Sequence, residues 1–591
     1  MLTKEKQDQI LKIINIVLAI FGFLSFISLI MITGFYISDS VINFLTLFIK
    51  IQIAFFILQE IYRFIVTHNK KDFIKRRYIE LLIAVFFLLF LVFPDQISDL
   101  FKSIFQSLKP NDLDIIYLIT AQVPFLIVIF RKLLKYAVNL GRIQLHSGAI
   151  FMISFAIIIL FGTFLLMLPK SVPLGSPSIN FVNALFTSTS AVCVTGLAVL
   201  NVATDFSFTG QLFILSLIQI GGLGVLTLTA LFAMFANGGI SFQIRVIMSD
   251  VLSDDNLSDI TQLIKRIILY TFVSELICAI PMYISLGGSF SQPNGDHIYT
   301  AIFHSISAFC NAGFSTYSNN LMDPAVQNNY LFLSMIMILI TIGGIGFPVI
   351  QNLLHLKPFA PNQKRLRYQL TITTKVVLIT SFCLVVIPTI LLFFVEPMTY
   401  FPDSSEFGNF FHSLFLSVTS RTAGFNTLPL NDLRAPSVIL VICIMSIGAS
   451  PASTGGGIKT TTFAIVILQF FRLLKGQEKL FIFNREIHRE VVRKALLIMF
   501  AYFLCFAVAT FVISSIEPEY NIVDISFDVI SALSTVGLYR DFTPYFSVPT
   551  KFIIILCMFI GRIGVLTFFM AFHRPKLEPN YKLPKTHIMI G

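Results

Sequence analysis

Four short strings in this chain each hold a glycine followed by leucine or phenylalanine. They cover residues 190–197, 307–314, 418–425 and 531–538. Glycine adopts positive φ without a Cβ clash, so successive carbonyls of such a string can turn to one side. A ring of neutral carbonyls can replace the hydration shell of a potassium ion. None of the strings contains Asp or Glu, which argues against a carboxylate ring for divalent ions.

Three residues of each string are expected to line this selectivity filter and to hold potassium at their backbone carbonyls. They are Val194, Thr195, Gly196, Asn311, Ala312, Gly313, Thr422, Ala423, Gly424, Thr535, Val536 and Gly537. The pattern predicts no catalytic residues and no covalently or tightly bound cofactor.

The strings also mark an internal repeat. Their glycines are 111 to 117 residues apart, and a second glycine motif follows each, starting at Ile220, Ile342, Ile447 and Ile560. Close helix packing by small residues could account for this second set. It accounts poorly for the first set, because those glycines lie between spans. We therefore predict four parallel repeats of span, re-entrant pore loop and span around a pseudo-fourfold pore.

The elements that must position the strings are membrane helices. Of 591 residues, 56% are hydrophobic and only 12% are charged, too few charges for a soluble protein of this size. Runs of about 20 apolar residues, each able to cross roughly 30 Å of hydrocarbon, recur along the chain. We expect about twelve crossings in an all-α integral membrane fold. The expected spans are 10–33, 41–66, 79–94, 113–130, 149–168, 211–236, 263–285, 329–352, 374–395, 436–473, 493–515 and 550–571.

These spans divide the chain into an extension, four repeats and a tail. Residues 1–135 form an N-terminal transmembrane extension of about four helices. The pore repeats cover 148–236, 262–352, 374–473 and 493–572, and 573–591 form a cytoplasmic tail. Lys50 and Glu60 fall within the second span, where charge is costly and often functional. We favour the alternative that they snorkel to opposite interfaces.

Basic residues set the expected orientation. Lys and Arg gather after the second and fourth spans and in two later linkers, 364–367 and 472–494. The positive-inside rule then places the N-terminus and these loops in the cytoplasm of a multi-pass cell-membrane protein. The net charge of +11 is thereby explained without nucleic acid as a partner. Acidic residues on the other side, such as Asp296 and Glu517, would concentrate cations at the outer mouth.

The span 436–473 is predicted to be broken, because its middle cannot remain helical. The expected gate comprises Gly448, Ala449, Ser450, Pro451, Ala452, Ser453, Thr454, Gly455, Gly456, Gly457, Lys459 and Arg562. The loop should hang in the pore beneath the filter, although a simple kink is the alternative. Arg562 either faces the pore as an opposing charge or pairs with carbonyls or with Glu275, and both can hold. We expect Arg421 to brace the filter from behind, and His304 and His412 to be structural.

These motifs resemble the Trk/Ktr/HKT superfamily of potassium transporters, most closely its KtrB membrane subunits. Residues 193–197, 311–315 and 420–427 are similar to the family's first three filters, 450–462 to its gating loop, and 561–564 to its last helix. The resemblance covers about residues 148–591. It implies potassium uptake by a homodimer with one pore per subunit, and a cytoplasmic nucleotide-binding ring of KtrA or TrkA type as regulator. The N-terminal extension departs from KtrB and has no functional interpretation.

The favoured function is a gated, channel-like potassium pore, with sodium activation or coupling left open. A carrier working by alternating access is the alternative, but it would be expected to show inverted repeats. A membrane enzyme ranks last, since the chain has no HExxH, GxSxG or paired acidic motif.

Overall fold

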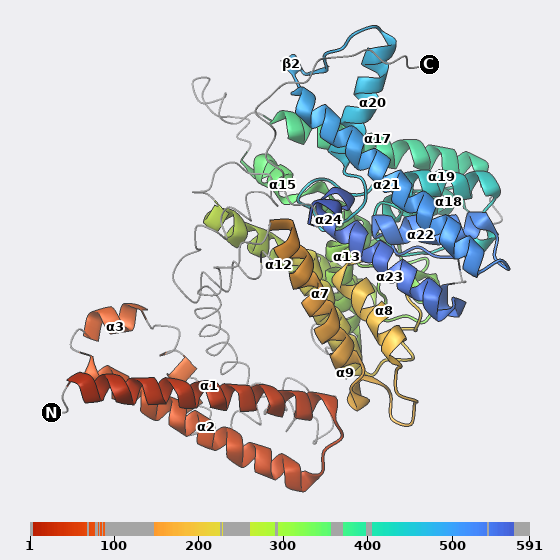
Figure 1. Ribbon diagram of the computed structural model, residues 1–591. Coiled ribbons are helices and arrows are strands. Elements are labelled where there is room, and N and C mark those ends of the chain that lie inside the picture. Colours follow the sequence, from red (N-terminus) through yellow and green to blue (C-terminus); the bar gives the residue numbers. More distant parts are fainter. Residues whose placement is uncertain are drawn as a thin grey trace.

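The computed structural model describes residues 4–67, 70–76, 147–224, 260–289, 294–355, 370–396, 405–540 and 543–571, with a few further positions at 81–88 and Thr227. The described chain is mostly helical, as predicted (Figure 1). Six described helices are long and apolar enough to cross a membrane, or up to eight if each of two bent pairs counts as one span. This number fits a multi-pass membrane protein.

Two long helices form the described part of the N-terminal extension. They are α1 (Lys4–Gly34) and α2 (Asp39–Val66), and the short α3 (Lys70–Arg76) follows. The pair has its own apolar cluster and lies at one edge of the molecule (Figure 1). It contacts the rest of the chain where Phe26 stacks on Phe161 and where Lys170 Nζ donates to the Ile32 carbonyl at 3.3 Å. Of the two further expected spans, 113–130 lies wholly and 79–94 mostly outside the described residues.

One expectation for this pair is wrong. Lys50 is exposed, but Glu60 does not snorkel: its residue surface is 3% exposed, and its Oε1 accepts a hydrogen bond from Gln59 Nε2 at 2.9 Å. A second buried bond joins the two helices, from Ser25 Oγ to Gln52 Oε1 at 2.7 Å. Gln52 and Glu60 of α2 thus have hydrogen-bond partners within the protein, which in a membrane replace contact with water.

Each repeat consists of an outer helix, a short pore helix and a second helix. The first has α7 (Ser147–Leu166), α8 (Phe181–Val192) and α9 (Phe208–Leu223); the second has α12 (Ile260–Ser285), α13 (Gly295–Cys310) and α14 (Tyr330–Ile345). The third has α17 (Ile372–Val395), α18 (Glu406–Thr419) and α19 (Ala435–Ser446); the fourth has α21 (Arg489–Ile516), α22 (Ile522–Ser534) and α23 (Val548–Ile563).

The four pore helices begin alike. Asn180, Asn294, Ser405 and Asn521 each cap one of them, and each side chain accepts a hydrogen bond from a backbone amide of the first turn. Such caps satisfy amides that have no partner within the helix. The caps fix where each pore helix starts. They thereby help to set the position of its C-terminal end, where the glycine string begins.

The repeats pack around a common centre. The second helix of each repeat contacts the pore helix of the next: α9 packs on α13, α14 on α18, α19 on α22, and α23 on α8. The last contact returns to the first repeat, so the order closes into a ring. This is the pseudo-fourfold arrangement that parallel repeats predict.

The second helices break more often than predicted, because only 436–473 was expected to be interrupted. Helix α14 bends by 99° at Gly346 into α15 (Phe347–Leu354), and α23 bends by 97° at Gly564 into α24 (Val565–Ala571). Helix α9 ends at Gly224, whose φ of 81° is close to the 97° and 93° of the other two. Glycine adopts such angles without steric cost. The third repeat therefore differs in the length of its break.

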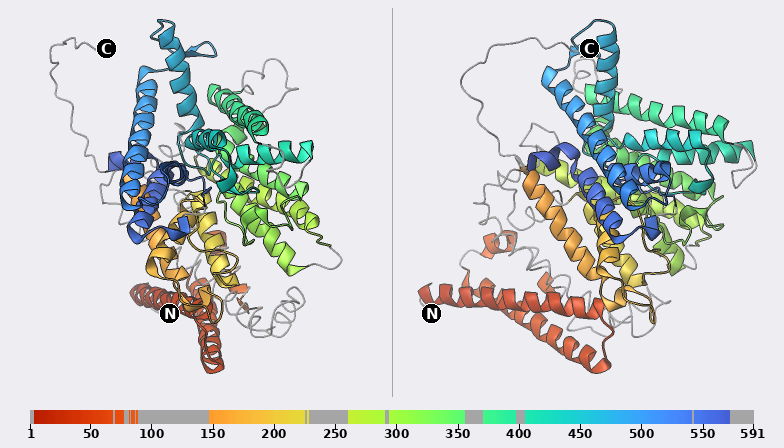
Figure 2. Two further views of the ribbon diagram at one scale, coloured as in Figure 1. Left: turned by 90° about the vertical axis from the view of Figure 1, so that its right-hand side faces the viewer. Right: turned by 45° about the vertical axis from the view of Figure 1, so that its right-hand side comes forward.

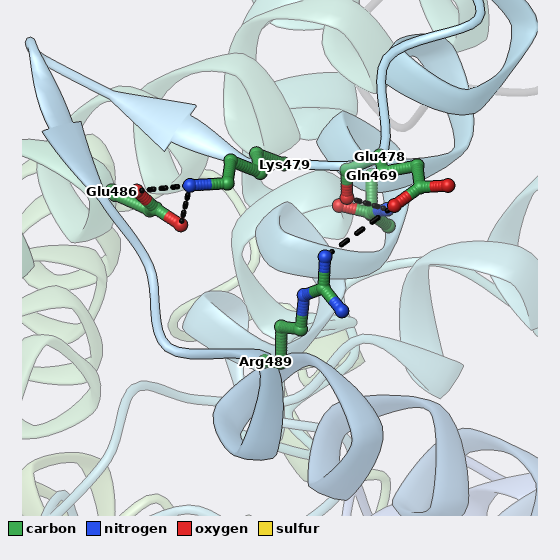
Figure 3. Close-up of polar contacts among 5 residues, drawn as sticks. All are labelled: Gln469, Glu478, Lys479, Glu486 and Arg489. Atoms are coloured by element: carbon green, nitrogen blue, oxygen red, sulfur yellow. Dashed lines mark hydrogen bonds and ion pairs between the residues drawn. The ribbon is translucent and has the colours of Figure 1, made fainter.

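After this break the third repeat continues as α20 (Thr460–Leu474), which leads into a hairpin of β1 (Phe481–Ile482) and β2 (Arg485–Glu486). Positive φ at Phe483 and Asn484 makes the two-residue turn that a right-twisted hairpin favours. The hairpin projects beyond the bundle (Figure 2). Two exposed ion pairs lie at the hairpin and its flanks. Lys479 pairs with Glu486 at 3.1 Å, and Arg489 pairs with Glu478 at 3.4 Å (Figure 3). Such pairs are individually weak.

Candidate ion pathway

The four glycine strings share one backbone conformation. In every string the glycine and the residue two positions before it have positive φ, and the residue between them does not. The φ values are 56° and 93° at Val194 and Gly196, 61° and 69° at Asn311 and Gly313, 69° and 79° at Thr422 and Gly424, and 53° and 98° at Thr535 and Gly537. This alternation turns successive carbonyls to one side of the string. Positive φ is strained for valine and threonine, so the surroundings must hold it in place.

The strings also meet one another in a closed ring. A Cβ added to each filter glycine would collide with the carbonyl oxygen of the next repeat's string. From the added Cβ, the Ala312 oxygen is 2.5 Å away at Gly196 and the Ala423 oxygen is 2.6 Å away at Gly313. The Val536 oxygen is 2.6 Å away at Gly424, and the Thr195 oxygen is closer still at Gly537. The structure thus brings all twelve predicted filter residues together, and the eight that are not glycine are fully buried.

Each string is tied to the last turn of its own pore helix. Thr195, Ala312 and Val536 donate their amides to the carbonyls of Ser190, Ser307 and Ser531 at 2.7 to 2.8 Å. In the first and fourth repeats the serine side chain adds a bond, since Ser190 Oγ and Ser531 Oγ each accept from the filter glycine amide at 3.0 Å. These bonds supply the support that the strained φ angles need.

The third repeat reaches the same geometry with a shifted anchor. It has Val418 where the others have serine, and α18 ends earlier relative to its glycine than the other pore helices. Thr419, one residue later, takes over: its carbonyl accepts from the Ala423 amide at 2.9 Å and its Oγ1 donates to the Phe425 carbonyl at 2.6 Å. Ser307 makes the equivalent bond to Phe314 at 2.8 Å.

The ring has an electrostatic bias toward cations. The C-terminal ends of all four pore helices lie next to it, and a helix C-terminus carries a partial negative charge. The strings contribute carbonyls and neutral side chains. A monovalent cation is the species that such a site stabilises.

Of the predicted gate residues, 448–457 form a loop against the ring that leads into α20, and Arg562 lies on α23. The loop is held mainly by the second repeat, where Ser450 and Thr454 donate their amides to the carbonyls of Gly344 and Gly343 at 3.0 and 3.2 Å. In return the Phe347 amide donates to the Ala452 carbonyl at 3.1 Å. The carbonyls of Gly343 and Gly344 and the amide of Phe347 lack partners within their own helix, because α14 breaks at Gly346 and because Pro348 has no amide to donate. The bend in one repeat therefore creates the docking site for the loop of another.

The two ends of the loop lie side by side. Ile447 and Ile458 form an isolated parallel bridge, and the Gly448 amide donates to the Ile458 carbonyl at 2.9 Å. Ser450 and Thr454, on either side of the tip, are 0% exposed, while the tip residues 451–453 are half-buried. Beneath the filter, Gly455 and Gly456 approach Thr422 and Thr535 so closely that an added Cβ would clash with either hydroxyl.

Two cations hold the loop by its carbonyls. Arg562, in the last turn of α23, donates to the carbonyls of Thr454 in the loop and Gly221 in α9. Lys459 Nζ donates to the Gly455 carbonyl at 2.6 Å. Of the two interpretations of Arg562, pairing with carbonyls is the one that its contacts show. Glu275 instead accepts from Gln219 Nε2 at 3.1 Å.

The remaining predicted residues support the filter from outside. Arg421 donates to Ser381 Oγ on α17 at 3.2 Å, behind the ring. His304 lies 2.8 Å from the Thr300 carbonyl and 2.9 Å from Ser315 Oγ, while His412 Nδ1 lies 3.0 Å from Thr427 Oγ1. Both histidines thus join a pore helix to the segment that follows its string, which is a structural role.

Sequence reasoning missed the carbonyls of Gly343 and Gly344 as the loop's docking site. The signal was the final glycine of each second motif, at 224, 346 and 564. In the second repeat, Pro348 was a further sign that the helix could not continue unchanged.

Comparisons with known protein families, sequences and structures give consistent matches. The model of a family described as cation transport protein, TrkH, matches residues 120–580. The potassium/sodium uptake protein NtpJ of Enterococcus hirae is 34% identical over 459 residues, which are 77% of this chain and 98% of that protein. The Ktr system potassium uptake protein B of Bacillus subtilis is 33% identical over 449 residues, 74% and 95% of the two chains. The crystal structure of the potassium transporter TrkH from Vibrio parahaemolyticus has a TM-score of 0.58 at 18% identity, covering 84% of this chain and 98% of that chain.

Proposed function

The chain belongs to the TrkH family of cation transport proteins, and from that premise we propose that it takes up potassium through a gated, channel-like pore. The observation that carries the proposal is the closed ring of four glycine strings. Each string has positive φ at the same two positions, and each glycine abuts the next string's carbonyl. A ring of neutral oxygens selects a weakly hydrated monovalent cation such as potassium.

In this proposal the loop 448–457 is the gate. It occupies the space next to the ring and contacts groups from the second, third and fourth repeats, while Arg562 links it to the first. Irregular backbone at membrane depth persists where protein or water satisfies it. Withdrawal of the loop would open a path from the filter toward α20, which we assign to the cytoplasm with the N-terminus.

The test is flux through purified protein in liposomes, driven by a potassium gradient and followed with rubidium-86. A pore gives passive rubidium flux that far exceeds sodium flux and carrier turnover. Equal rubidium and sodium flux would overturn the filter assignment. Slow flux with a fixed coupling ratio would favour the second candidate, a carrier with alternating access.

Sodium enters the proposal as an activating or a coupled ion, because the relative from Enterococcus hirae is named as a potassium/sodium uptake protein. Varying sodium at fixed potassium separates the two roles. An activator raises potassium flux without being transported, whereas a coupled ion moves with it. Sodium-independent potassium flux would exclude both.

We propose further that the protein works as a homodimer under a cytoplasmic nucleotide-binding ring of KtrA or TrkA type. The basic hairpin and its flanks support the second part, since Lys475, Lys479, Arg485 and Arg489 are exposed at the end of the bundle. Cross-linking of native membranes should recover a dimer and a ring protein. Recovery of a monomer alone would refute both parts.

A further inference from the structure

The position two residues before each filter glycine lies at the edge of the ring that faces the gate loop. We call it the threshold position, and its occupants are Val194, Asn311, Thr422 and Thr535. All four have positive φ and no exposed surface. The backbone is therefore fourfold at this level, but the side chains are not.

The four threshold side chains have different partners. Asn311 Nδ2 donates to Thr422 Oγ1 at 3.2 Å, so these two join neighbouring strings. Val194 has no hydroxyl. Thr535 Oγ1 accepts the backbone amide of Gly456, in the gate loop, at 3.0 Å. Among the described residues this is the hydrogen bond that joins a threshold side chain to the gate loop.

We propose that the Thr535 hydroxyl is a latch that holds the gate loop against the filter. The proposal rests on the proposed function of the loop as gate and adds the residue through which filter and gate communicate. The other loop bonds run to the backbone of α13 and α14 and to Arg562 and Lys459. Those anchors lie on neighbouring helices or on the loop's own flank. Thr535 belongs to the ring itself.

The local geometry is specific to this bond. Gly456 must be glycine, because an added Cβ would collide with Thr535 Oγ1. Both partners are buried, so in the closed state neither amide nor hydroxyl has water as an alternative partner. Withdrawal of the loop must break the bond, and the latch therefore stabilises the closed state relative to any open one.

The chain supplies its own template for a clean test. Val194 occupies the threshold position of the first repeat with φ of 56°, and Thr535 has φ of 53°. Valine is therefore compatible with this backbone in this ring. Thr535→Val keeps the shape of the side chain and removes only the acceptor.

The experiment measures rubidium-86 flux through the full chain in liposomes, without a regulatory partner. A single net hydrogen bond predicts that Thr535→Val raises flux roughly threefold to tenfold, while Thr535→Ser restores the wild-type rate. Thr341→Val is the matched control, because Thr341 is exposed on α14 and donates to its own helix at Met337. Rubidium preference over sodium is measured in parallel and confirms that the ring has folded.

A second background separates a latch from a simple filter residue. In protein lacking Ala449 to Gly456, Thr535→Val should no longer raise the flux, because the Gly456 amide that it would release is gone. The latch is refuted if Thr535→Val changes flux equally in both backgrounds, or lowers it in both. If the deletion alone fails to raise flux, the gate assignment fails instead, whatever Thr535→Val does. Unchanged flux in Thr535→Val beside raised flux in the deletion refutes the latch alone.

Discussion

The filter ring and the layer beneath it obey different symmetries. In the ring, all four repeats share the same pair of positive φ angles and the same contact between a glycine and the next string. In the layer beneath, the second helices of the first, second and fourth repeats each break at one glycine, with φ between 81° and 97°. The second helix of the third repeat is interrupted by the whole loop 448–457. Fourfold backbone geometry thus stops at the threshold position.

This difference matches what the proposed function requires of each layer. A dehydrated ion needs oxygens on all sides, so every repeat must contribute equally to the ring. A blocking element needs to act at one point, and one repeat can supply it. In the proposed function the irregular segment lies outside the ring, and its withdrawal breaks the bond from the Gly456 amide to Thr535. The backbone asymmetry is confined to the layer beneath the ring.

The strongest test of the ring is Gly196→Ser. The substitution adds a Cβ at φ of 93° and 2.5 Å from the Ala312 carbonyl, and strain of about 1–3 kcal/mol at such a position should tilt that carbonyl. We expect the potassium-to-sodium preference, measured as competing fluxes, to fall by about tenfold or more. Gly175→Ser is the matched control, because Gly175 also has positive φ, 91°, but nothing within 4 Å. Equal selectivity in both variants would show that the ring is not the filter.

Deleting Ala449 to Gly456 tests the layer beneath. The deletion removes the segment that fills the space next to the ring, so flux should rise severalfold while the ion preference stays at the wild-type level. Rubidium flux and a sodium competition assay measure the two quantities. Unchanged or lower flux in folded protein would mean that the segment is a structural kink. A changed ion preference would mean that the two layers are not independent.

Arg562→Gln should have a smaller effect in the same direction. It removes the charge that donates to the carbonyls of Thr454 and Gly221, and bonds from a charged group contribute about 1.5–3 kcal/mol. Flux without a regulatory partner should increase, but less than in the deletion. Arg562→Lys keeps the charge with fewer donors and should lie between Gln and wild type. Loss of flux in Arg562→Gln would contradict the anchoring role.

The smallest expected effect tests the symmetry of the ring itself. Ser190→Ala and Ser531→Ala each remove one bond to a filter glycine amide, at 3.0 Å in both cases. A neutral hydrogen bond contributes about 0.5–1.5 kcal/mol, so each variant should lose only about twofold to tenfold in ion preference. The two losses should be equal within error. A marked difference between the two losses would show that the first and fourth repeats do not contribute equally to ion preference.

The glycine strings were predictable because they recur four times at nearly constant spacing. The loop was predictable because Pro451 and three consecutive glycines cannot remain in a helix. The bends at Gly346 and Gly564 were not, since hydropathy continues through them and a glycine within a membrane helix usually signals packing. Packing does occur: an added Cβ at Gly221, Gly343 or Gly561 would strike the last turn of a pore helix. The motif serves both purposes, and its pattern alone does not separate them.

Contacts between distant segments could not be derived from the sequence. The choice of Arg562 between a carboxylate and carbonyls depends on where the loop folds, more than 100 residues earlier in the chain. The shift of the third anchor from a serine to Thr419 depends on where α18 ends. Glu60 is buried, although its charge and its place in an apolar span do not indicate burial.

The bridge between Ile447 and Ile458 has a consequence for how this repeat can vary in length. Since the chain enters and leaves the loop at adjacent points, α19 and α20 keep their mutual placement whatever lies between them. Adding residues to a segment whose ends already touch costs little in chain entropy, about 0.6 kcal/mol per doubling of length. The segment is thus a modular insertion: it can be shortened, lengthened or carry a reporter group without redesign of the bundle around it.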